Sequence, residues 1–310
     1  MRTTSTVLPK SWLAFELNVL RRIDYSTVSI PLANADNLGR VLKHWNVQVN
    51  ANSPLKSRYI STLVSIENNG EMLDAESVNT LLSDVYVPQY QLQNASLTNW
   101  FSETDSWWFD NLRRNISKLT SPIQKAIALD LGMKVGDYAL SFSGTTLRLR
   151  QPLSDVFRKL WNIHKPPVNN TKTNKCSNKQ VGEFTAEIYT DLLFLRLPEA
   201  RKSALNSSLG KEAWREEWVR GNNHFWKRLE AENNEQLGAH IETKSQYLNL
   251  ITELFRTAQH IDVWAIEHIE DGFIQTQDIV EAISEVRRVD TIYSKDFSEL
   301  MGTKAVIITA

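Results

Sequence analysis

The sequence predicts an α/β protein in which helices flank a central sheet and a mostly helical segment interrupts the α/β part. Residues 27–54 change in apolar period from strand to helix and back to strand, which is the pattern of a βαβ unit. Residues 192–195 and 305–308 are short apolar runs with the length of buried strands. Between them, residues 70–175 carry helical patterns and few strand signals, which indicates an insertion.

The size and composition fit this class. With 310 residues, 42% of them hydrophobic and 23% charged, the chain can bury a large core. No apolar run approaches the roughly 20 residues that span a bilayer, and the first residues lack the apolar core of a signal peptide. The single cysteine, Cys176, excludes an internal disulfide and a cysteine-rich zinc site. We expect a cytoplasmic protein with no membrane partner and no metal.

The elements follow in order along the chain. Residues 12–23 and 55–68 predict helices on either side of the βαβ unit, whose own helix has Asp36 or Asn37 as a candidate N-cap. The insertion is expected to contain helices at 74–85, 111–119, 121–133 and 153–161, an aromatic connector at 86–109 and a polar loop at 169–179. Later elements are expected to be strands at 192–195, 261–266, 289–293 and 305–308, and helices at 247–258 and 275–287. The predicted domains are an α/β domain, 1–69 and 180–310, and a helical insertion, 70–179.

Positive charge is concentrated in one segment, although the net charge of the whole chain is −1. From Arg148 to Lys179 there are eight Lys or Arg residues and one acid, Asp155, which gives a net charge of +7 in 32 residues. Such a density favours contact with a phosphate backbone, and an ordinary solvated face is the alternative. The candidate DNA contacts are Arg148, Arg150, Arg158, Lys159, Lys172 and Lys175.

Three tryptophans recur in a segment that is otherwise highly charged. Trp214, Trp218 and Trp226 are spaced by four and eight residues, which puts them near one face of a helix. Core packing is the favoured interpretation. A partner-binding face is the alternative, because tryptophan is enriched in interface hot spots. The histidines of the chain show no spacing that is typical of metal ligands.

The order of the elements resembles that of the DNA adenine methyltransferases that act on the exocyclic amine, in the class whose α/β domain is split by a helical target-recognition insertion. Residues 30–39 (IPLANADNLG) stand where that family carries Asp-Pro-Phe-Ala-Gly-Ser-Gly-x-x-Gly. Asn52 and Ser53 stand at its Asn-Asp pair, and residues 191–199 (DLLFLRLPE) match its buried strand ending in Asp-Pro-Pro-Tyr. The resemblance implies a Rossmann-like methyltransferase sheet flanked by helices, and S-adenosylmethionine as the cofactor of any active member.

The cofactor motif departs from the family pattern. The family's glycines let the loop backbone approach S-adenosylmethionine closely, whereas Asn34 and Asp36 place side chains in that space. Leu32 stands at the motif's phenylalanine, and Ser53 stands at the acid that holds the ribose hydroxyls. The altered motif at these four positions predicts that no cofactor binds.

The catalytic motif is altered as well. Arg196 stands at the catalytic Asp, Leu197 at the first Pro and Glu199 at the Tyr, and only Pro198 is retained. Methyl transfer needs an acceptor that polarises the adenine amine and an aromatic platform for the flipped base. Arg196 offers only donors, and Glu199 has no aromatic face. A new acid/base pair of Arg196 and Glu199 is disfavoured, because charged residues in such loops are more often solvated or ion-paired.

These observations predict a catalytically inactive, DNA adenine methyltransferase-like protein that serves as a DNA-binding or partner-binding subunit. Its partners would be DNA and a protein, such as an active methyltransferase or another component of a restriction-modification or phage-defence system. One alternative is an active S-adenosylmethionine-dependent DNA adenine methyltransferase with divergent motifs. Another is a structural assembly subunit that does not touch DNA. Salt-dependent DNA binding separates the first hypothesis from the last.

Overall fold

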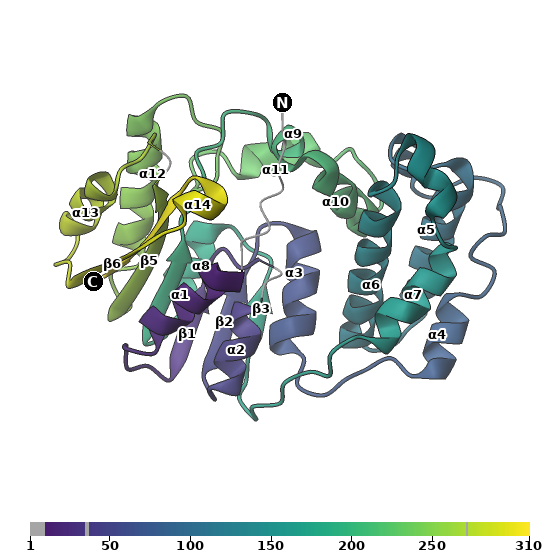
Figure 1. Ribbon diagram of the computed structural model, residues 1–310, viewed down its shortest axis with the longest axis horizontal. Coiled ribbons are helices and arrows are strands. Elements are labelled where there is room, and N and C mark those ends of the chain that lie inside the picture. Colours follow the sequence, from purple (N-terminus) through teal and green to yellow (C-terminus); the bar gives the residue numbers. More distant parts are fainter. Residues whose placement is uncertain (1–9, 35–36, 271) are drawn as a thin grey trace.

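The computed structural model describes residues 10–34, 37–270 and 272–310, and it places a sheet domain beside a helical lobe (Figure 1). The sheet has seven strands in the order β3-β2-β1-β4-β5-β7-β6. Neighbouring strands from β3 to β5 are parallel, whereas β7 is antiparallel to both β5 and β6. The strands are β1 (Thr27–Ile30), β2 (Gln48–Asn52), β3 (Lys175–Ser177), β4 (Leu192–Arg196), β5 (Val263–Glu270), β6 (Thr291–Asp296) and β7 (Lys304–Thr309).

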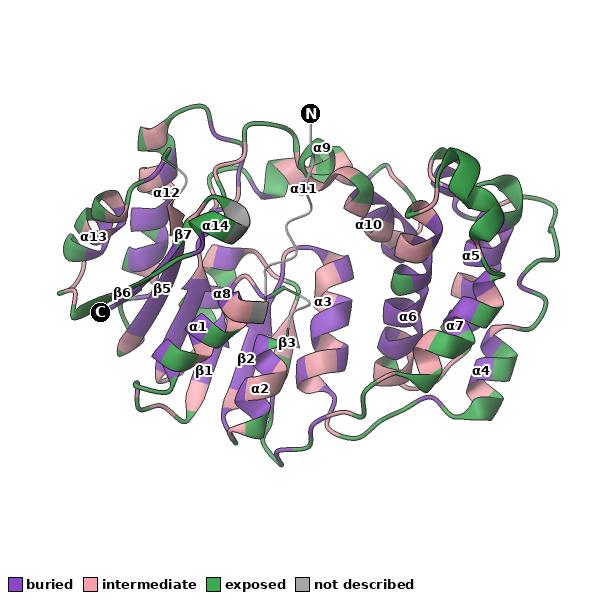
Figure 2. Cartoon of the chain, viewed as in Figure 1, coloured by how far each residue is buried: buried purple, intermediate pink, exposed green. Residues whose placement is uncertain are grey.

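Helices cover both faces of the sheet, so the predicted class, a mixed α/β fold with a flanked sheet, is confirmed. Because side chains alternate along a strand, Leu192 and Phe194 pack on one face and Leu193 and Leu195 on the other. All four are fully buried, as are most central strand residues (Figure 2). The first face carries α1 (Lys10–Leu20) and α2 (Leu38–His44), and the second carries α8 (Val181–Glu187), α12 (Lys244–Thr257) and α13 (Thr276–Ser284).

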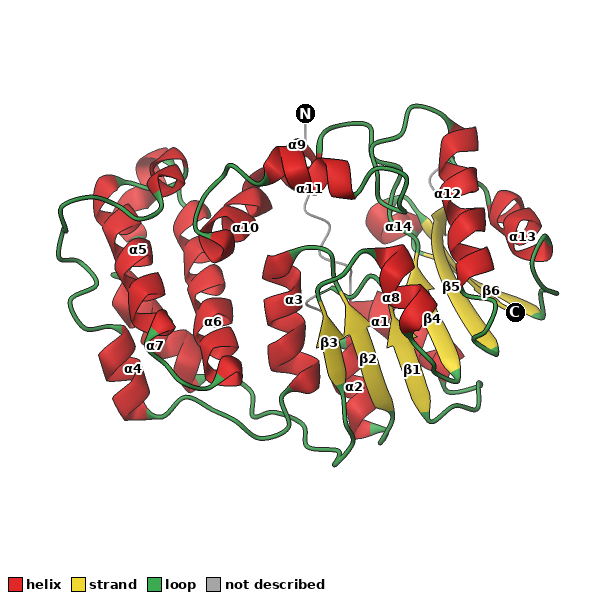
Figure 3. Ribbon diagram, turned by 180° about the vertical axis from the view of Figure 1, so that it is seen from behind, coloured by secondary structure: helices red, strands yellow, loops and turns green. Residues whose placement is uncertain are grey.

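The helical lobe is the helical bundle that lies beside the sheet (Figures 1 and 3). Its helices are α4 (Ala75–Leu81), α5 (Glu103–Ser117), α6 (Pro122–Leu140), α7 (Leu153–Asn162) and α10 (Ala213–Arg220). Between sheet and lobe lies α3 (Lys56–Thr62), continued by the π-helical η1 (Leu63–Glu67), and Ile60 and Val64 join the core of the lobe. The predicted cap of α6 is confirmed: Ser121 Oγ accepts from the amides of Ile123 and Gln124, both at 3.2 Å.

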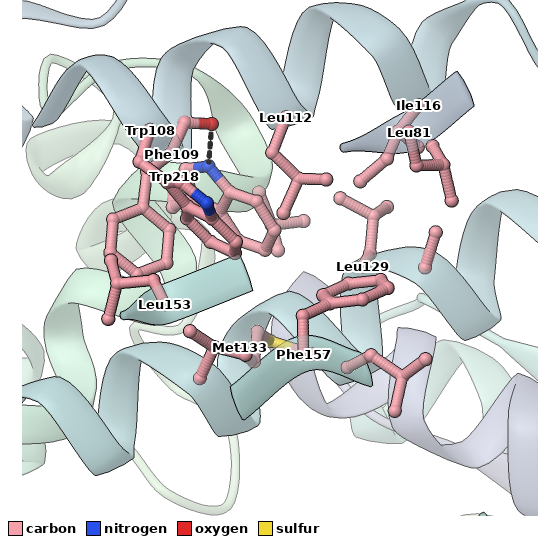
Figure 4. Close-up of a cluster of buried hydrophobic side chains, with 14 of the residues drawn as sticks. Leu81, Trp108, Phe109, Leu112, Ile116, Leu129, Met133, Leu153, Phe157 and Trp218 are labelled. Carbon is pink, nitrogen blue, oxygen red and sulfur yellow. Dashed lines mark hydrogen bonds between the residues drawn. The ribbon is translucent and has the colours of Figure 1, made fainter. Parts of the chain in front are cut away.

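Two tryptophans of α10 form the centre of the core of the lobe. Trp214 and Trp218 are fully buried, and Trp218 Nε1 donates to the carbonyl oxygen of Phe109 at 3.0 Å (Figure 4). The rings lie directly on two glycines of α6. A Cβ on Gly136 would lie 2.1 Å from the Trp214 ring, and one on Gly132 would lie 2.3 Å from the Trp218 ring. Core packing, the favoured interpretation of these two tryptophans, is confirmed.

The segment that contains α10 also fastens the lobe to the sheet domain. Glu216 is buried and caps α3, because its two carboxylate oxygens accept from the amides of Lys56 and Ser57 at 2.9 Å and 2.8 Å. The third tryptophan, Trp226, is half-buried outside the lobe and donates to Glu217 Oε1 at 2.9 Å. The other elements of this segment are α9 (Leu205–Leu209), η4 (Gly210–Glu212) and α11 (Trp226–Glu232).

Two predictions for the insertion are wrong. Residues 175–177 do not belong to a loop but form β3, which pairs with β2 at the edge of the sheet. An edge strand is held by its backbone and needs few apolar residues, so its sequence carries no strand signal. The predicted aromatic connector at 86–109 is not irregular throughout, because α5 begins at Glu103, with Ser102 as its N-cap. Trp108 and Phe109 of this helix are buried in the core of the lobe. The remaining short elements are η2 (Ala95–Asn99), η3 (Gly144–Leu149) and α14 (Ser298–Met301).

The other predicted elements lie close to their expected places. The expected strands at 192–195, 261–266, 289–293 and 305–308 correspond to β4, β5, β6 and β7. In the parts of the chain that the structure describes, no helix has both the length and the apolar character that crossing a bilayer requires.

Candidate functional site at the carboxyl end of the sheet

The predicted motif residues meet at the carboxyl ends of the parallel strands. β1 and β4 are neighbours in the sheet, and the chain continues from β1 toward β2 on one side and from β4 toward β5 on the other. Such a topological switch point is where open α/β sheets place their ligands. Residues 31–34 follow β1, Asn52 and Ser53 end β2, and residues 196–199 end β4, so one edge collects all three motifs. We call this region the carboxyl edge.

Arg196 is held in a buried ionic cluster under α1. Its Nε and Nη2 each donate to one oxygen of Glu16 at 2.8 Å, and Nε lies 3.4 Å from Glu267 Oε2. Glu267 is the register partner of Arg196 in β5 and accepts from the indole N–H of Trp12. The exposed fractions of the Arg196, Glu16 and Glu267 side chains are 10%, 0% and 3%. A bidentate ion pair this deep fixes the guanidinium in place.

Among the described residues, the cluster has two carboxyl groups, Glu16 and Glu267, and one guanidinium, Arg196. Burial first, and then the neighbouring Glu16, raise the pKa of Glu267 well above its ordinary range, while Arg196 acts in the opposite direction. With one proton on the carboxyl pair the cluster is neutral. Without it the cluster carries an uncompensated negative charge, which is costly at this depth.

Asn52 ties together the ends of three strands. Its Nδ2 donates to the carbonyl oxygens of Pro31 and Lys179, both at 3.1 Å, and its Oδ1 accepts from the amide of Lys179 at 2.9 Å. Ser53, which stands at the family's ribose-binding acid, is buried, and its amide donates to the carbonyl oxygen of Ser177 at 3.0 Å. The backbone groups at the end of β2 are therefore engaged within the protein.

The loop after β1 is engaged in the same way. Asn34 Oδ1 accepts from Arg58 Nη1 at 3.1 Å, and Leu32 packs against the apolar core under α12. The amide of Ala33 donates to the carbonyl oxygen of Asn52 at 2.8 Å. Asp36 lies outside the residues that the structure describes. Two of the loop residues at which the family's motif is altered thus already have protein partners.

Little space remains beside the residues of the catalytic motif. Leu197, Pro198 and Glu199 line a cavity together with Tyr247 and His268, and its volume is about 10 Å³. The hydroxyl of Tyr247 donates to the carbonyl oxygen of Pro198 and closes one side. Such a volume holds about one water molecule, so neither an adenine ring nor S-adenosylmethionine fits in this cavity as it stands.

Sequence reasoning missed Glu16 and Glu267. Each is an acid within an otherwise apolar stretch, WLAFELNVL in α1 and VWAIEHI in β5. A carboxyl group at a core position of a helix or strand is a usable signal, because it must find a partner when it is buried. The signal does not name that partner, since Glu16 and Arg196 are 180 residues apart in the sequence.

The predicted DNA contacts fall into two groups. Lys172 and Lys175 are exposed beside the sheet, where the chain enters β3. Arg148, Arg158 and Lys159 are exposed on the helical lobe, at η3 and α7. Arg158 Nη1 donates to Asn79 at 2.9 Å, and Lys159 Nζ donates to Gln151 at 2.6 Å, which leaves both cations open to solvent.

Arg150 differs from the other candidates. Its Nη1 and Nη2 donate to the two carboxylate oxygens of Asp105 at 2.7 Å and 2.9 Å, and the Asp105 side chain is only 4% exposed. This pair fastens the end of η3 to α5. The positive charge of Arg150 is therefore engaged inside the lobe.

The Cys176 thiol is not activated, and the described residues form no metal site. Burial is the main cause that raises the pKa of the Cys176 thiol to about 12, so the thiol stays protonated and unreactive at neutral pH. Within the described residues, no three or more His, Cys, Asp and Glu side chains are grouped so that they could hold a metal ion.

Comparison with known proteins adds no family to this description. No protein-family profile matches the sequence, and no curated protein matches it. The contacts of the carboxyl edge and of the helical lobe are therefore the basis for a functional proposal.

Proposed function

We propose that the protein is a catalytically inactive, methyltransferase-like subunit whose role is binding. The main support for this proposal is the buried ionic cluster of Arg196, Glu16 and Glu267. At the end of β4, where the resembled family places its catalytic acceptor, this chain has a guanidinium bound by Glu16 and Glu267. A guanidinium cannot accept a hydrogen bond from the adenine amine, and one held by two buried carboxyl groups cannot swing aside.

The architecture supports the fold part of the proposal by analogy. A sheet in which an antiparallel β7 lies between β5 and β6, with a helical lobe after α3, agrees with the split methyltransferase domain that the sequence resembles. Because a fold hosts many functions, the assignment of an inactive member rests on the carboxyl edge and not on the topology.

Titration of the protein with S-adenosylmethionine by calorimetry, with and without duplex DNA, tests the loss of the cofactor. The proposal expects no binding heat at millimolar cofactor in either titration. The control is an active adenine methyltransferase in the same buffer. Micromolar binding by this chain would overturn the proposal and make residues 196–199 a candidate active site.

DNA is the ligand that we propose for the exposed cations of the helical lobe. Each phosphate contact contributes about 0.9 to the slope of log K against log salt. We expect Arg148→Gln and Lys159→Gln each to weaken duplex binding at all sequences and to lower that slope by about one contact. Arg256→Gln is the matched control, because this exposed arginine lies on α12, away from the lobe. Equal effects of all three substitutions, or no binding at low salt, would contradict the DNA proposal.

A protein partner is the second candidate, because apolar side chains are exposed on the lobe. Tyr90, Leu149 and Leu147 have exposed fractions of 100%, 68% and 52%. Such side chains favour a protein interface, and an active methyltransferase of a restriction-modification or phage-defence system is the partner class that we propose. Size-exclusion chromatography with a purified adenine methyltransferase tests this. Leu149→Asp should abolish the complex, whereas Tyr189→Asp, on the sheet domain, should leave it intact.

A further inference from the structure

The N-terminal helix α1 is attached to the sheet by polar as well as apolar contacts. Its Trp12 stacks on Phe297 with 5.0 Å between ring centroids and donates its indole N–H to Glu267. One turn later, Glu16 receives both hydrogen bonds from Arg196. The helix therefore contributes one of the two carboxyl groups of the buried cluster, and the sheet contributes the other.

The proton content of the cluster follows from its composition. Within the described part of the chain, the buried Glu267 Oε2 accepts no hydrogen bond, and its contact with Arg196 Nε is long at 3.4 Å. Arg196 Nε and Nη2 instead donate to the two oxygens of Glu16 at 2.8 Å. An acidic proton held between the two carboxyl groups satisfies Glu267 and neutralises the excess charge.

Among the residues that the structure describes, the charged groups that act on Glu267 belong to the cluster itself. Glu16 and Arg196 are the charged groups that act on the Glu267 carboxyl. On β7, the register partner of Glu267 is the apolar Ile307. The next residue in β5, His268, alternates to the opposite face, and its Nε2 contacts the carbonyl oxygen of Ile274 at 3.1 Å.

We propose that α1 is a proton-linked strap, which docks on the sheet with one proton shared by Glu16 and Glu267 and loosens when that proton is lost. Loosening uncovers Arg196 and the end of β4, so the strap controls access to the carboxyl edge. The inference rests on the cluster alone and stands whether or not the protein binds DNA or S-adenosylmethionine.

The sign of the effect is fixed by where the proton is held. In the undocked state the Glu267 carboxyl is in water and ionises near the ordinary glutamate pKa of about 4.3. In the docked state burial and the neighbouring carboxyl raise the pKa of Glu267, so the docked state holds one proton more between these two values. Docking therefore weakens as the pH rises through this interval, by up to tenfold in the docking constant per pH unit.

Hydrogen exchange of the backbone amides between pH 6 and pH 9, corrected for the intrinsic rates, measures the docking of α1. In the wild-type protein we expect the protection of α1 amides to fall with pH, by up to tenfold per unit, relative to amides of α6. Glu267→Gln preserves the shape of the side chain but cannot ionise, so it stays a neutral partner for Glu16 at every pH. The protection of the α1 amides in this variant should therefore not depend on pH. Glu16→Gln removes the second carboxyl group and should also abolish the dependence.

The outcomes are distinct. Wild-type α1 protection that tracks α6 at every pH, or a pH dependence that persists in both glutamine variants, would overturn the strap. If one variant does not fold, the other still decides, because either substitution removes the need for the shared proton. Cofactor and DNA titrations play no part in this readout, so a failure of the proposed function leaves the result interpretable.

Discussion

The core of the helical lobe and the carboxyl edge are both buried, but different interactions stabilise them. The lobe packs Trp214 and Trp218 onto bare backbone at Gly136 and Gly132, and its stability grows with the apolar area removed from water. The carboxyl edge is closed by the Arg196 cluster and by Asn52, whose contacts are directional and, in the cluster, depend on protonation. The core of the lobe around these tryptophans is therefore held mainly by apolar packing. The carboxyl edge, where an α/β fold places chemistry, is closed mainly by polar contacts, one of them to a carboxyl group whose pKa burial raises.

The largest expected effect tests the lobe. Trp218→Ala removes a fully buried indole and leaves a cavity above Gly132, so the free energy of unfolding should fall by about 3–5 kcal/mol. Urea unfolding at pH 6 and pH 9 should give the same loss, because no titrating group contributes to this packing. Trp226→Ala, at a half-buried site outside the lobe, is the control and should cost clearly less.

The second prediction tests the carboxyl edge. Arg196→Met leaves Glu16 and Glu267 buried without a cation, so the free energy of unfolding should fall by about 3 kcal/mol at pH 8. Because burial raises the pKa of Glu267 and protonation of this carboxyl relieves part of the charge, the loss should shrink toward pH 5, in contrast to the loss at Trp218. Arg196→Lys should recover part of it, since lysine restores the charge but not the bidentate geometry. A loss that is equal at both pH values would rule out the charged-cluster account.

The third prediction concerns the fit between α6 and α10. Gly136→Ala places a methyl group 2.1 Å from the Trp214 ring, and overpacking of this kind costs about 1–3 kcal/mol. Alanine also improves helix propensity by about 1 kcal/mol, so the net loss should be at most about 2 kcal/mol. Gly70→Ala has no atom within 4 Å of the new methyl group and should change thermal stability little. Equal melting temperatures for the two variants would contradict the close packing.

The smallest expected effect concerns the start of α6. Ser121→Ala removes the hydroxyl that accepts from the amides of Ile123 and Gln124, and the loss of such a cap costs about 1 kcal/mol. Ser121→Asp should retain most of the stability, because aspartate is an equally good cap. Thermal unfolding measures both variants against the wild-type protein. A stable alanine variant would mean that the proline at position 122 alone defines the helix start.

Local chemistry made much of the fold predictable. The period of apolar residues predicted α6, α7, β4 and β7, and Ser121 before a proline predicted a helix start. By contrast, β3 was missed because an edge strand can form without an apolar pattern. Of the long α5 only the second half was predicted, as a helix at 111–119, because the aromatic and charged residues around Trp108 give no simple period. The motif positions at the carboxyl edge were found through a resemblance, but their contacts were not.

The sequence by itself determined the class of the fold, the Ser121 cap of α6 and the residue types at the altered motifs, because these depend on neighbours along the chain. Tertiary structure decided that α10 completes the core of the lobe, that Arg150 pairs with Asp105, and that Arg196 is bound by Glu16 and Glu267. These contacts join residues that are 45 to 180 positions apart. The type of a charged residue, which the sequence gives, defines only which hydrogen bonds the side chain can donate or accept. Its partner is chosen when the sheet and helices pack, because burial then forces each charge to be matched.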